Sequence, residues 1–292
     1  MKATRRLMLG ISLSILVVGV NSMVALASTA PGLGTAASYA ILAGTPNVTN
    51  TGATVVSGSL GISPAAAVTG FPPGTVLNGT IQAGTAAAGV AKNDLTAAYG
   101  VAASSPCNFN KTGVNLGGGS TLTPGTYCQT TAPTLTGVLT LSGNGVFIFQ
   151  IGSTLVTAPG ASVVLTNGAQ PCNVFWQVSS SATLDTTTNF VGTIMALTSI
   201  SLNNGVILQG RALARNGAVT LINDQITAPT SCNAVTVAGP TPAPTVSGAP
   251  AGGGGPMQND SFPWILALVA GVLAGAGAVG AALTIRGDRR RT

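Results

Sequence analysis

The sequence Gly192–Ala196, which reads GTIMA, returns further along the chain as Gly210–Ala214, which reads GRALA. In the same way, Ile200–Leu202 (ISL) returns as Val219–Leu221 (VTL), at a slightly longer spacing. A period of about 18 residues suits a coil of three short strands, each followed by a turn. One such coil cannot bury its apolar side alone, so neighbouring coils must stack. The repeat therefore predicts a mainly β protein built as a three-sided β-solenoid.

The residues before the repeat predict further strands and one helix. Val146–Ile151 and Asn173–Val178 are rich in β-branched and aromatic residues, and we expect both to form buried strands. Residues 80–104 are rich in Ala and lack Pro, which predicts a helix. Because three Gly weaken it, this helix should form only where it docks on the strands. Its expected buried face consists of Ile81, Ala88, Ala91, Leu95, Ala98 and Ala102.

The N-terminal residues 1–27 have the three parts of a secretory signal peptide. Basic residues come first, an apolar run follows, and Ala25–Ala27 forms a small-residue cleavage motif. We expect the mature chain to begin at Ser28; a short uncleaved anchor is the alternative. The folded domain is then predicted to cover residues 28–233.

The C-terminal residues predict a membrane anchor. Residues 262–285 carry no charge, and a helix of this length crosses about 30 Å of hydrocarbon. The basic tail 286–292 follows, and the positive-inside rule keeps such a tail in the cytoplasm. The Pro/Gly/Ala-rich residues 234–261 form a stalk. We therefore expect an exported protein at the cell surface, anchored in the plasma membrane with its body outside. This ending also resembles a cell-wall sorting signal, but the LPxTG motif is absent.

Charge is scarce, and this excludes several classes of function. Only 5% of the residues are charged, and the net charge of +6 comes from the two chain ends, so the domain has no basic stripe for nucleic acid. The chain has no His, which excludes a His-dependent catalytic triad. Asp94, Asp185 and Asp224 have no paired acid nearby in the sequence, as glycosidases require. We predict that the protein is not an enzyme and has no cofactor, metal or small-molecule substrate.

The chain has four Cys, all in the part expected outside the cell, where disulfides persist. A metal site is the weaker alternative, because there is neither a His nor a C-x-x-C spacing. Four Cys allow three pairings. We favour Cys107 with Cys128, which would tie the end of the helix to the next coil. The remaining pair, Cys172 with Cys232, would fasten the last coils near the stalk.

A recurrent four-residue element supplies the candidate functional surface. Its second place is Leu, which should point inward, so the first and third places face outward and the fourth lies at the turn. Stacked coils repeat such an element about every 4.8 Å, which arranges its polar groups in regular, almost uncharged rows. The candidate residues are Thr154, Thr157, Thr183, Thr186, Ser201, Asn204, Thr220 and Asn223.

Several longer motifs occur in a fixed order between residues 33 and 232. They include Leu33–Ala43, Gly58–Pro64, Leu122–Tyr127, Val146–Gly152 and Gly210–Val219. In these motifs the chain resembles the large ice-binding domain family of bacteria, algae and fungi. The resemblance implies a right-handed, discontinuous β-solenoid of triangular cross-section, with one long helix alongside and with N-terminal and C-terminal coils interleaved.

The resemblance also implies a function. Members of this family bind ice through a flat solenoid face that often carries Thr-x-Thr or Thr-Ala/Gly-x-Thr/Asn patterns, and the candidate residues above match these in part. Ice, with its ordered water, is then the expected partner, and the protein would inhibit ice growth or recrystallisation or hold cells at ice. The alternative is a structural or adhesive surface module on the same fold without useful ice affinity. Regular Thr, Ser and Asn rows on a flat face would favour ice, whereas a groove with aromatic platforms would favour glycan.

Overall fold

The structure, a computed structural model, describes residues 28–231, which belong to one compact unit. The predicted signal peptide, stalk, membrane helix and basic tail lie outside the described residues, as does Cys232. Among the described residues, no helix is both long enough and apolar enough to span a membrane. The predictions on export and anchoring therefore stay predictions.

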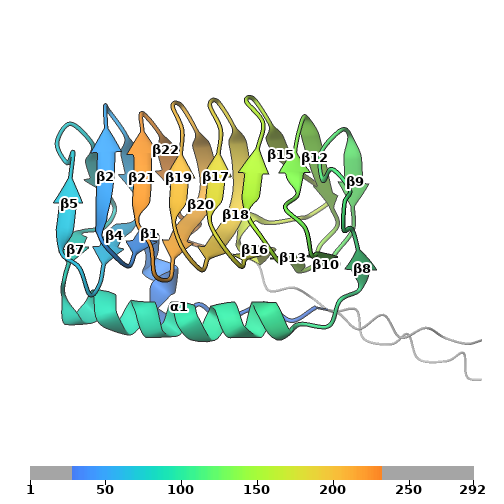
Figure 1. Cartoon of the computed structure of the whole chain (residues 1–292), viewed down its shortest axis with the longest axis horizontal. Coiled ribbons are helices and arrows are strands. Elements are labelled where there is room, and N and C mark those ends of the chain that lie inside the picture. Colours follow the sequence, from blue (N-terminus) through green and yellow to red (C-terminus); the bar gives the residue numbers. More distant parts are fainter. Residues whose placement is uncertain (1–27, 232–292) are drawn as a thin grey trace, which may run out of the picture. The chain divides into compact units, whose positions relative to one another are not determined.

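Strands are the main secondary structure of the described chain, and every pair of neighbouring strands is parallel (Figure 1). The strands form three columns, which we call the helix face, the threonine face and the mixed face. The threonine face is the seven-stranded sheet. Its strands, in spatial order, are β11 (Thr134–Leu135), β14 (Leu155–Thr157), β17 (Ala182–Leu184), β19 (Ile200–Leu202), β21 (Val219–Ile222), β2 (Asn47–Thr51) and β5 (Ala67–Thr69).

The other two columns belong to one 15-stranded sheet. The mixed face contains β9 (Ser120–Leu122), β12 (Val138–Ser142), β15 (Ser162–Thr166), the first halves of β18 (Asn189–Ala196) and β20 (Ile207–Ala214), β22 (Gln225–Thr227), β3 (Val55–Ser57) and β6 (Thr75–Leu77). The helix face contains β8 (Phe109–Asn110), β10 (Gly125–Gln129), β13 (Phe147–Ile151), β16 (Val174–Val178), the second halves of β18 and β20, β1 (Tyr39–Ala43), β4 (Ser59–Ile62) and β7 (Ile81–Ala83).

Two strands turn the corner between these columns without a break. The strands β18 and β20 pair along their whole length, with Gly192 beside Gly210. A Cβ atom at Gly210 would lie 1.8 Å from the carbonyl oxygen of Gly192, so only glycine fits where the two bends stack. The predicted repeat of Gly192–Ala196 is this pairing, and the predicted repeat of Ile200–Leu202 is the pairing of Ile200 with Val219. Both are confirmed.

The coils do not stack in chain order. The first three strands β1, β2 and β3 pair with the last three, β20, β21 and β22. The chain then completes one more coil with β5, β6 and β7, and the helix α1 (Ala86–Ser104) carries it back to the opposite end, where β8 begins (Figure 1). This is the interleaving that the resemblance implies. The hand of the coil stays a prediction.

The inward-facing side chains of the three columns fill the interior. An aromatic row runs along it, in which the rings of Phe149 and Trp176 stack with their centroids 3.9 Å apart. These two rings lie on β13 and β16, so both predicted buried strands are confirmed. Trp176 also donates its indole N–H to the carbonyl of Val191, which satisfies its only polar atom.

The helix α1 begins later than predicted. Residues 81–83 form the strand β7, and Ile81 is 43% exposed, so the helix start at residue 80 and the place of Ile81 on its buried face are wrong. Gly84 has φ +65°, which ends β7, and the side chain of Thr85 caps the helix by accepting from the amide N–H of Ala88. The other residues predicted for this face are buried, namely Ala88, Ala91, Leu95, Ala98 and Ala102. Tyr99, which was not predicted, is buried on the same face.

Charged side chains tie the helix and both described chain ends to the helix face. Lys92 of α1 donates hydrogen bonds to the carbonyls of Ala214 and Arg215. Burial is the main cause that lowers the pKa of Lys92 to about 8, and the positive charge of Arg215 lowers it further. Asp94 accepts two hydrogen bonds from Thr35 in the short helix η1 (Gly34–Ser38). Arg211 is almost fully buried and donates to the carbonyls of Ala37 and Pro229.

The cysteines agree with the prediction as far as the structure describes them. Cys107 and Cys128 form a disulfide, which ties the segment after α1 to β10. Cys172, which belongs to the short helix η2 (Pro171–Asn173), is also disulfide-bonded. Its predicted partner, Cys232, lies outside the described residues, so the second pairing stays a prediction.

Candidate functional site

One outward position is shared by all seven strands of the threonine face. The strand pairings place these seven residues side by side in an unbroken row. We call this row the ladder. In spatial order it consists of Thr134, Val156, Thr183, Ser201, Thr220, Thr49 and Thr69.

The side chains of each strand alternate between the two sides of the sheet, and the ladder residues lie on the outer side. Leu184, Leu202 and Leu221 follow their ladder residues directly and are fully buried, so the inward Leu of the predicted element is confirmed. Successive side chains of a strand point to opposite sides, and the ladder residues therefore face away from the core. Neighbouring rungs are close enough to interact, because the hydroxyls of Thr49 and Thr220 lie 3.4 Å apart.

The predicted candidate residues fall into three groups. Thr183, Ser201 and Thr220 are rungs of the ladder. Thr186, Asn204 and Asn223 lie at the corner between the threonine face and the mixed face, where the amide of Asn223 donates to the side-chain oxygen of Asn204. This corner forms a second polar row at the border of the ladder.

The third group, Thr154 and Thr157, is placed incorrectly by the sequence. Thr157 is 1% exposed and points into the coil, where its hydroxyl accepts from the amide N–H of Asp185 and contacts the hydroxyl of Thr188. The strand β14 is shifted by two residues relative to the predicted alignment, so Val156, not Thr154, pairs with Thr183. Thr154 precedes β14 and is not a rung of the ladder.

Sequence reasoning missed four rungs: Thr49, Thr69, Thr134 and Val156. Thr49 and Thr69 belong to N-terminal strands that lie beside the C-terminal strand β21 only because the coils are interleaved. A signal existed, because Asn47-Val48-Thr49 and Ala67-Val68-Thr69 share a buried or partly buried Val before an outward Thr. The order in which these segments stack, however, leaves no local pattern in the sequence.

The ladder is uncharged, and one charged side chain borders it. Asp185 follows β17 directly and accepts from the amide of Asn203 on the neighbouring coil and from the N–H of Thr186. These two hydrogen bonds, the one from Asn203 first, lower the pKa of the Asp185 carboxyl, so it is ionised at neutral pH. Asp224 lies at the same corner but is buried, and burial raises its pKa to about 7.

The mixed face differs from the threonine face in its outward residues. It exposes large aliphatic side chains at Val138, Val164 and Ile207, each 40% exposed or more. Amide side chains such as Gln209 and Gln225 lie between them in the same rows. Rows of unlike groups cannot repeat one pattern along the solenoid. The helix α1 runs along the helix face (Figure 1). Within residues 28–231, the threonine face is therefore the open face that presents a periodic polar row to solvent.

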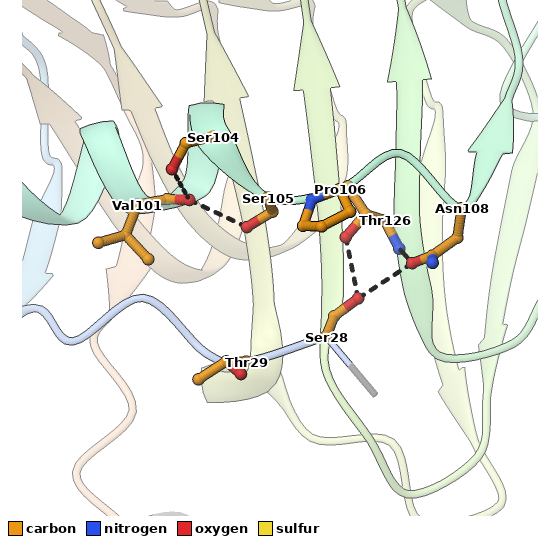
Figure 2. Close-up of a pocket in the computed structure, with 8 residues that line it drawn as sticks. All are labelled: Ser28, Thr29, Val101, Ser104, Ser105, Pro106, Asn108 and Thr126. Carbon is orange, nitrogen blue, oxygen red and sulfur yellow. Dashed lines mark hydrogen bonds between the residues drawn. The ribbon is translucent and has the colours of Figure 1, made fainter. Parts of the chain in front are cut away.

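The hollows of the described residues hold no set of groups suited to catalysis. One has a volume of about 340 Å³ and lies where Ser28 and Thr29 pass the end of α1 (Figure 2). Its polar groups are already bonded to one another: Ser28 contacts Asn108 and Thr126, and the hydroxyls of Ser104 and Ser105 donate to the carbonyl of Val101. Between residues 28 and 231, no three metal-binding side chains come together.

The fold and this surface define a class of protein: a parallel β-solenoid with one helix alongside and a neutral threonine row on an open face. The sequence profile of the Ice-binding-like family matches residues 41–227, and the chain belongs to this family. It is 50% identical over 199 residues to an ice-binding protein of Nostoc sp. strain HG1, an alignment that covers 66% of this chain and 72% of the relative.

Solved structures show the same fold. An ice-binding protein from an Antarctic biological consortium has a TM-score of 0.66 and 43% identity, covering 75% of this chain and 96% of its own. The ice-binding protein of the Antarctic ascomycete Antarctomyces psychrotrophicus also has a TM-score of 0.66, with 36% identity, covering 70% of this chain and 100% of its own. These two solved chains contain little beyond the matched part, so in them a chain of about this length carries the whole fold.

Proposed function

We propose that this protein binds ice through the threonine face, without enzymatic activity, and that it does so at the cell surface. The observation that carries the proposal is the ladder, in which six of seven rungs are Thr or Ser. The chain's membership of a family whose relatives are named ice-binding proteins supports it.

Threonine suits a surface that must match ice. Its β-branched side chain has few rotamers, so each rung is held in place before ice arrives and little entropy is lost on binding. The hydroxyl anchors a water molecule, and the methyl group sheds water favourably when the two surfaces meet. Strand stacking spaces the rungs about 4.8 Å apart along the solenoid. Water ordered on this row joins the ice lattice, and the bound protein curves the advancing ice front and opposes its growth.

The place where the described chain ends favours display of this face. Residues 228–231 follow β22 and leave at the corner between the mixed face and the helix face, where Arg211 holds the carbonyl of Pro229. In a three-sided coil this corner lies opposite the threonine face. A chain attached to a membrane beyond residue 231, as the sequence predicts, would therefore leave the ladder free to meet ice.

The test is the uptake of fluorescently labelled residues 28–232 into a growing single-crystal ice hemisphere. Changing Thr183 and Thr220 together to Tyr places two large rings on the ladder while keeping residues that favour strands. We expect the unchanged protein to enter ice on defined planes, and the double variant to lose this uptake. The matched control changes Thr121 and Thr227 on the mixed face to Tyr, and this variant should enter ice as before.

Each result decides between the two functions kept from the sequence. If the ladder variant enters ice unchanged while the mixed-face variant does not, the assignment of the face is wrong. If the correctly folded, unchanged protein is excluded from ice, the protein is instead a structural or adhesive surface module. Export and anchoring are tested separately, by protease treatment of intact cells, which should remove the domain and leave a membrane-bound fragment.

A further inference from the structure

Both ends of the solenoid present open strand edges. At one end, the coil formed by β5, β6 and β7 pairs on one side only, with β2, β3 and β4. We call it the first end coil. At the other end, β8 pairs only with β10, β9 pairs only with β12, and residues 116–118 cover the edge of β11. Residues 109–122 therefore form the second end coil. These statements hold for the described residues 28–231.

Both end coils expose large apolar side chains. The described residues include ten large hydrophobic side chains that are exposed, and four of them lie on the end coils. Leu77 and Ile81 belong to the first end coil, with 50% and 43% of their surface exposed. Phe109 and Val114 belong to the second end coil, with 42% and 51% exposed.

Charges that would keep another strand away are almost absent from both ends. Residues 67–83 contain no charged side chain, and residues 109–122 contain one, Lys111. Natural sheets commonly protect an open edge with charged side chains, especially Lys, or with Pro. Pro72 and Pro73 lie in the turn between β5 and β6, outside the strands, so the strand edges at this end keep their N–H groups.

We infer that the two ends dock on each other, so that a second copy of this chain stacks head to tail on the first. All strands are parallel, and each column ends in the same two coils. A copy shifted along the solenoid axis would therefore meet β9 with β6, β8 with β7 and residues 114–118 with β5, each in the parallel direction. Another copy of this chain offers three edges in this triangular order, which a single extended peptide does not.

The helix leaves room for this contact. Figure 1 shows that α1 begins beneath β5 and β7 and ends short of β8, so it does not project past either end coil. The contact is heterologous, joining unlike surfaces, and such contacts continue into open chains of copies. Stacking in this way would place the ladders of two copies in line, with residues 114–118 between the Thr69 end of one copy and the Thr134 end of the next.

The test is the molecular mass of residues 28–232 in solution, measured by sedimentation over a range of concentrations up to about 1 mM, where weak contacts become populated. We expect the mass of the unchanged protein to rise with concentration without stopping at a dimer. Changing Leu77 and Ile81 to Lys blocks the first end, and changing Val114 and Thr121 to Lys blocks the second. Each blocked variant alone should remain a monomer.

The decisive sample is an equal mixture of the two blocked variants. Each retains one intact end, and these ends are complementary, so the mixture should form a dimer and stop there. The matched control is Val90→Lys on the exposed side of α1, where a side chain of equal exposure changes and association should persist.

Three results would overturn the inference. The unchanged protein could remain a monomer at every concentration, one blocked variant could form dimers by itself, or the mixture could fail to associate. A dimer of a single blocked variant would indicate a symmetric contact through another surface. Ice uptake of each blocked variant is measured beside its mass, so that failure to stack is distinguished from failure to bind ice.

Discussion

Asp185 is the charged residue beside the otherwise uncharged ladder of the threonine face. Its carboxylate lies at the border of the ladder, whose rungs carry hydroxyl and methyl groups. The lowered pKa of this carboxyl keeps it charged at neutral pH. A fixed charge orients the surrounding water around itself rather than in the pattern of the neighbouring rungs. We therefore interpret Asp185 as a residue that weakens the match of this face to ice.

Replacing Asp185 by Asn should strengthen ice binding. The Asn side chain keeps an oxygen in place to accept from Asn203 and Thr186, so the corner should hold its shape while the charge is lost. A gain of about 1 kcal/mol corresponds to roughly a fivefold lower concentration for the same effect. The measurement is the concentration that halves ice recrystallisation.

The control for this change is Asp94→Asn. Asp94 also has a pKa lowered by hydrogen bonds, from Thr35, but it lies on α1 against the helix face. The change there should leave recrystallisation inhibition as it was. Equal effects of the two changes would mean that net charge, rather than the position of Asp185, sets the activity.

Among the secondary-structure elements, those that the sequence described well are the ones whose pattern is local. The bends at Gly192 and Gly210 repeat because two stacked strands need glycine at the same place, and this need is visible as a period. The start of α1 could not be predicted in this way. Residues 81–83 have a neutral composition, and they form a strand because β4 lies beside them.

Two glycine-to-alanine changes test the bend and the helix independently, because they should change the stability of the protein in opposite directions. Gly210→Ala places a methyl group 1.8 Å from a backbone oxygen, so it should destabilise the protein by about 3 kcal/mol, at the upper end of overpacking effects. Gly100→Ala on α1 meets no atom within 4 Å and should stabilise the protein by up to about 1 kcal/mol, because Ala favours helix.

The two glycine variants are compared by denaturant unfolding, with circular dichroism to report the folded fraction. If Gly210→Ala proved as stable as the unchanged protein, the backbones at this bend would be less closely stacked than described. If Gly100→Ala lost stability, α1 would not be the continuous helix described.

Over the whole molecule, the order of the coils makes the two ends of the folded chain depend on each other. In a solenoid stacked in chain order, removing the last coil leaves the rest supported by its neighbours. Here β20, β21 and β22 stand between the N-terminal coils and the remaining coils. Their removal would leave β1–β7 attached to the rest only through α1 and through the segment before β1, whose Ser28 contacts Asn108 and Thr126.

Ending the chain at residue 205 should therefore unfold the N-terminal coils together with the truncated end. Hydrogen exchange measured residue by residue should show that β1, β2 and β3 lose protection fully, although none of their residues is removed. The comparison is with the chain ended at residue 232. Protection retained in β1–β3 after truncation would show that these strands form a stable unit without the C-terminal coil.

The same dependence explains how much of the surface could be predicted. The sequence identified Thr183, Ser201 and Thr220, because these rungs follow one another along the chain at nearly constant spacing. It did not identify Thr49 and Thr69, which extend the row beyond Thr220, since the contact that places them there joins residues about 170 apart. No periodicity in a sequence records a contact of that kind.

The interleaved coils also have a consequence for folding during synthesis on the ribosome. Among the strands, the ribosome makes those of residues 39–83 first, but the place where they dock is built from residues 207–227, whose strands are made last. The early strands can pair with one another, but they lack the coil on which they dock until almost the whole domain has been synthesised. The N-terminal coils therefore cannot complete their folding while synthesis of the domain continues, and an incompletely folded polypeptide can still be passed through a narrow channel.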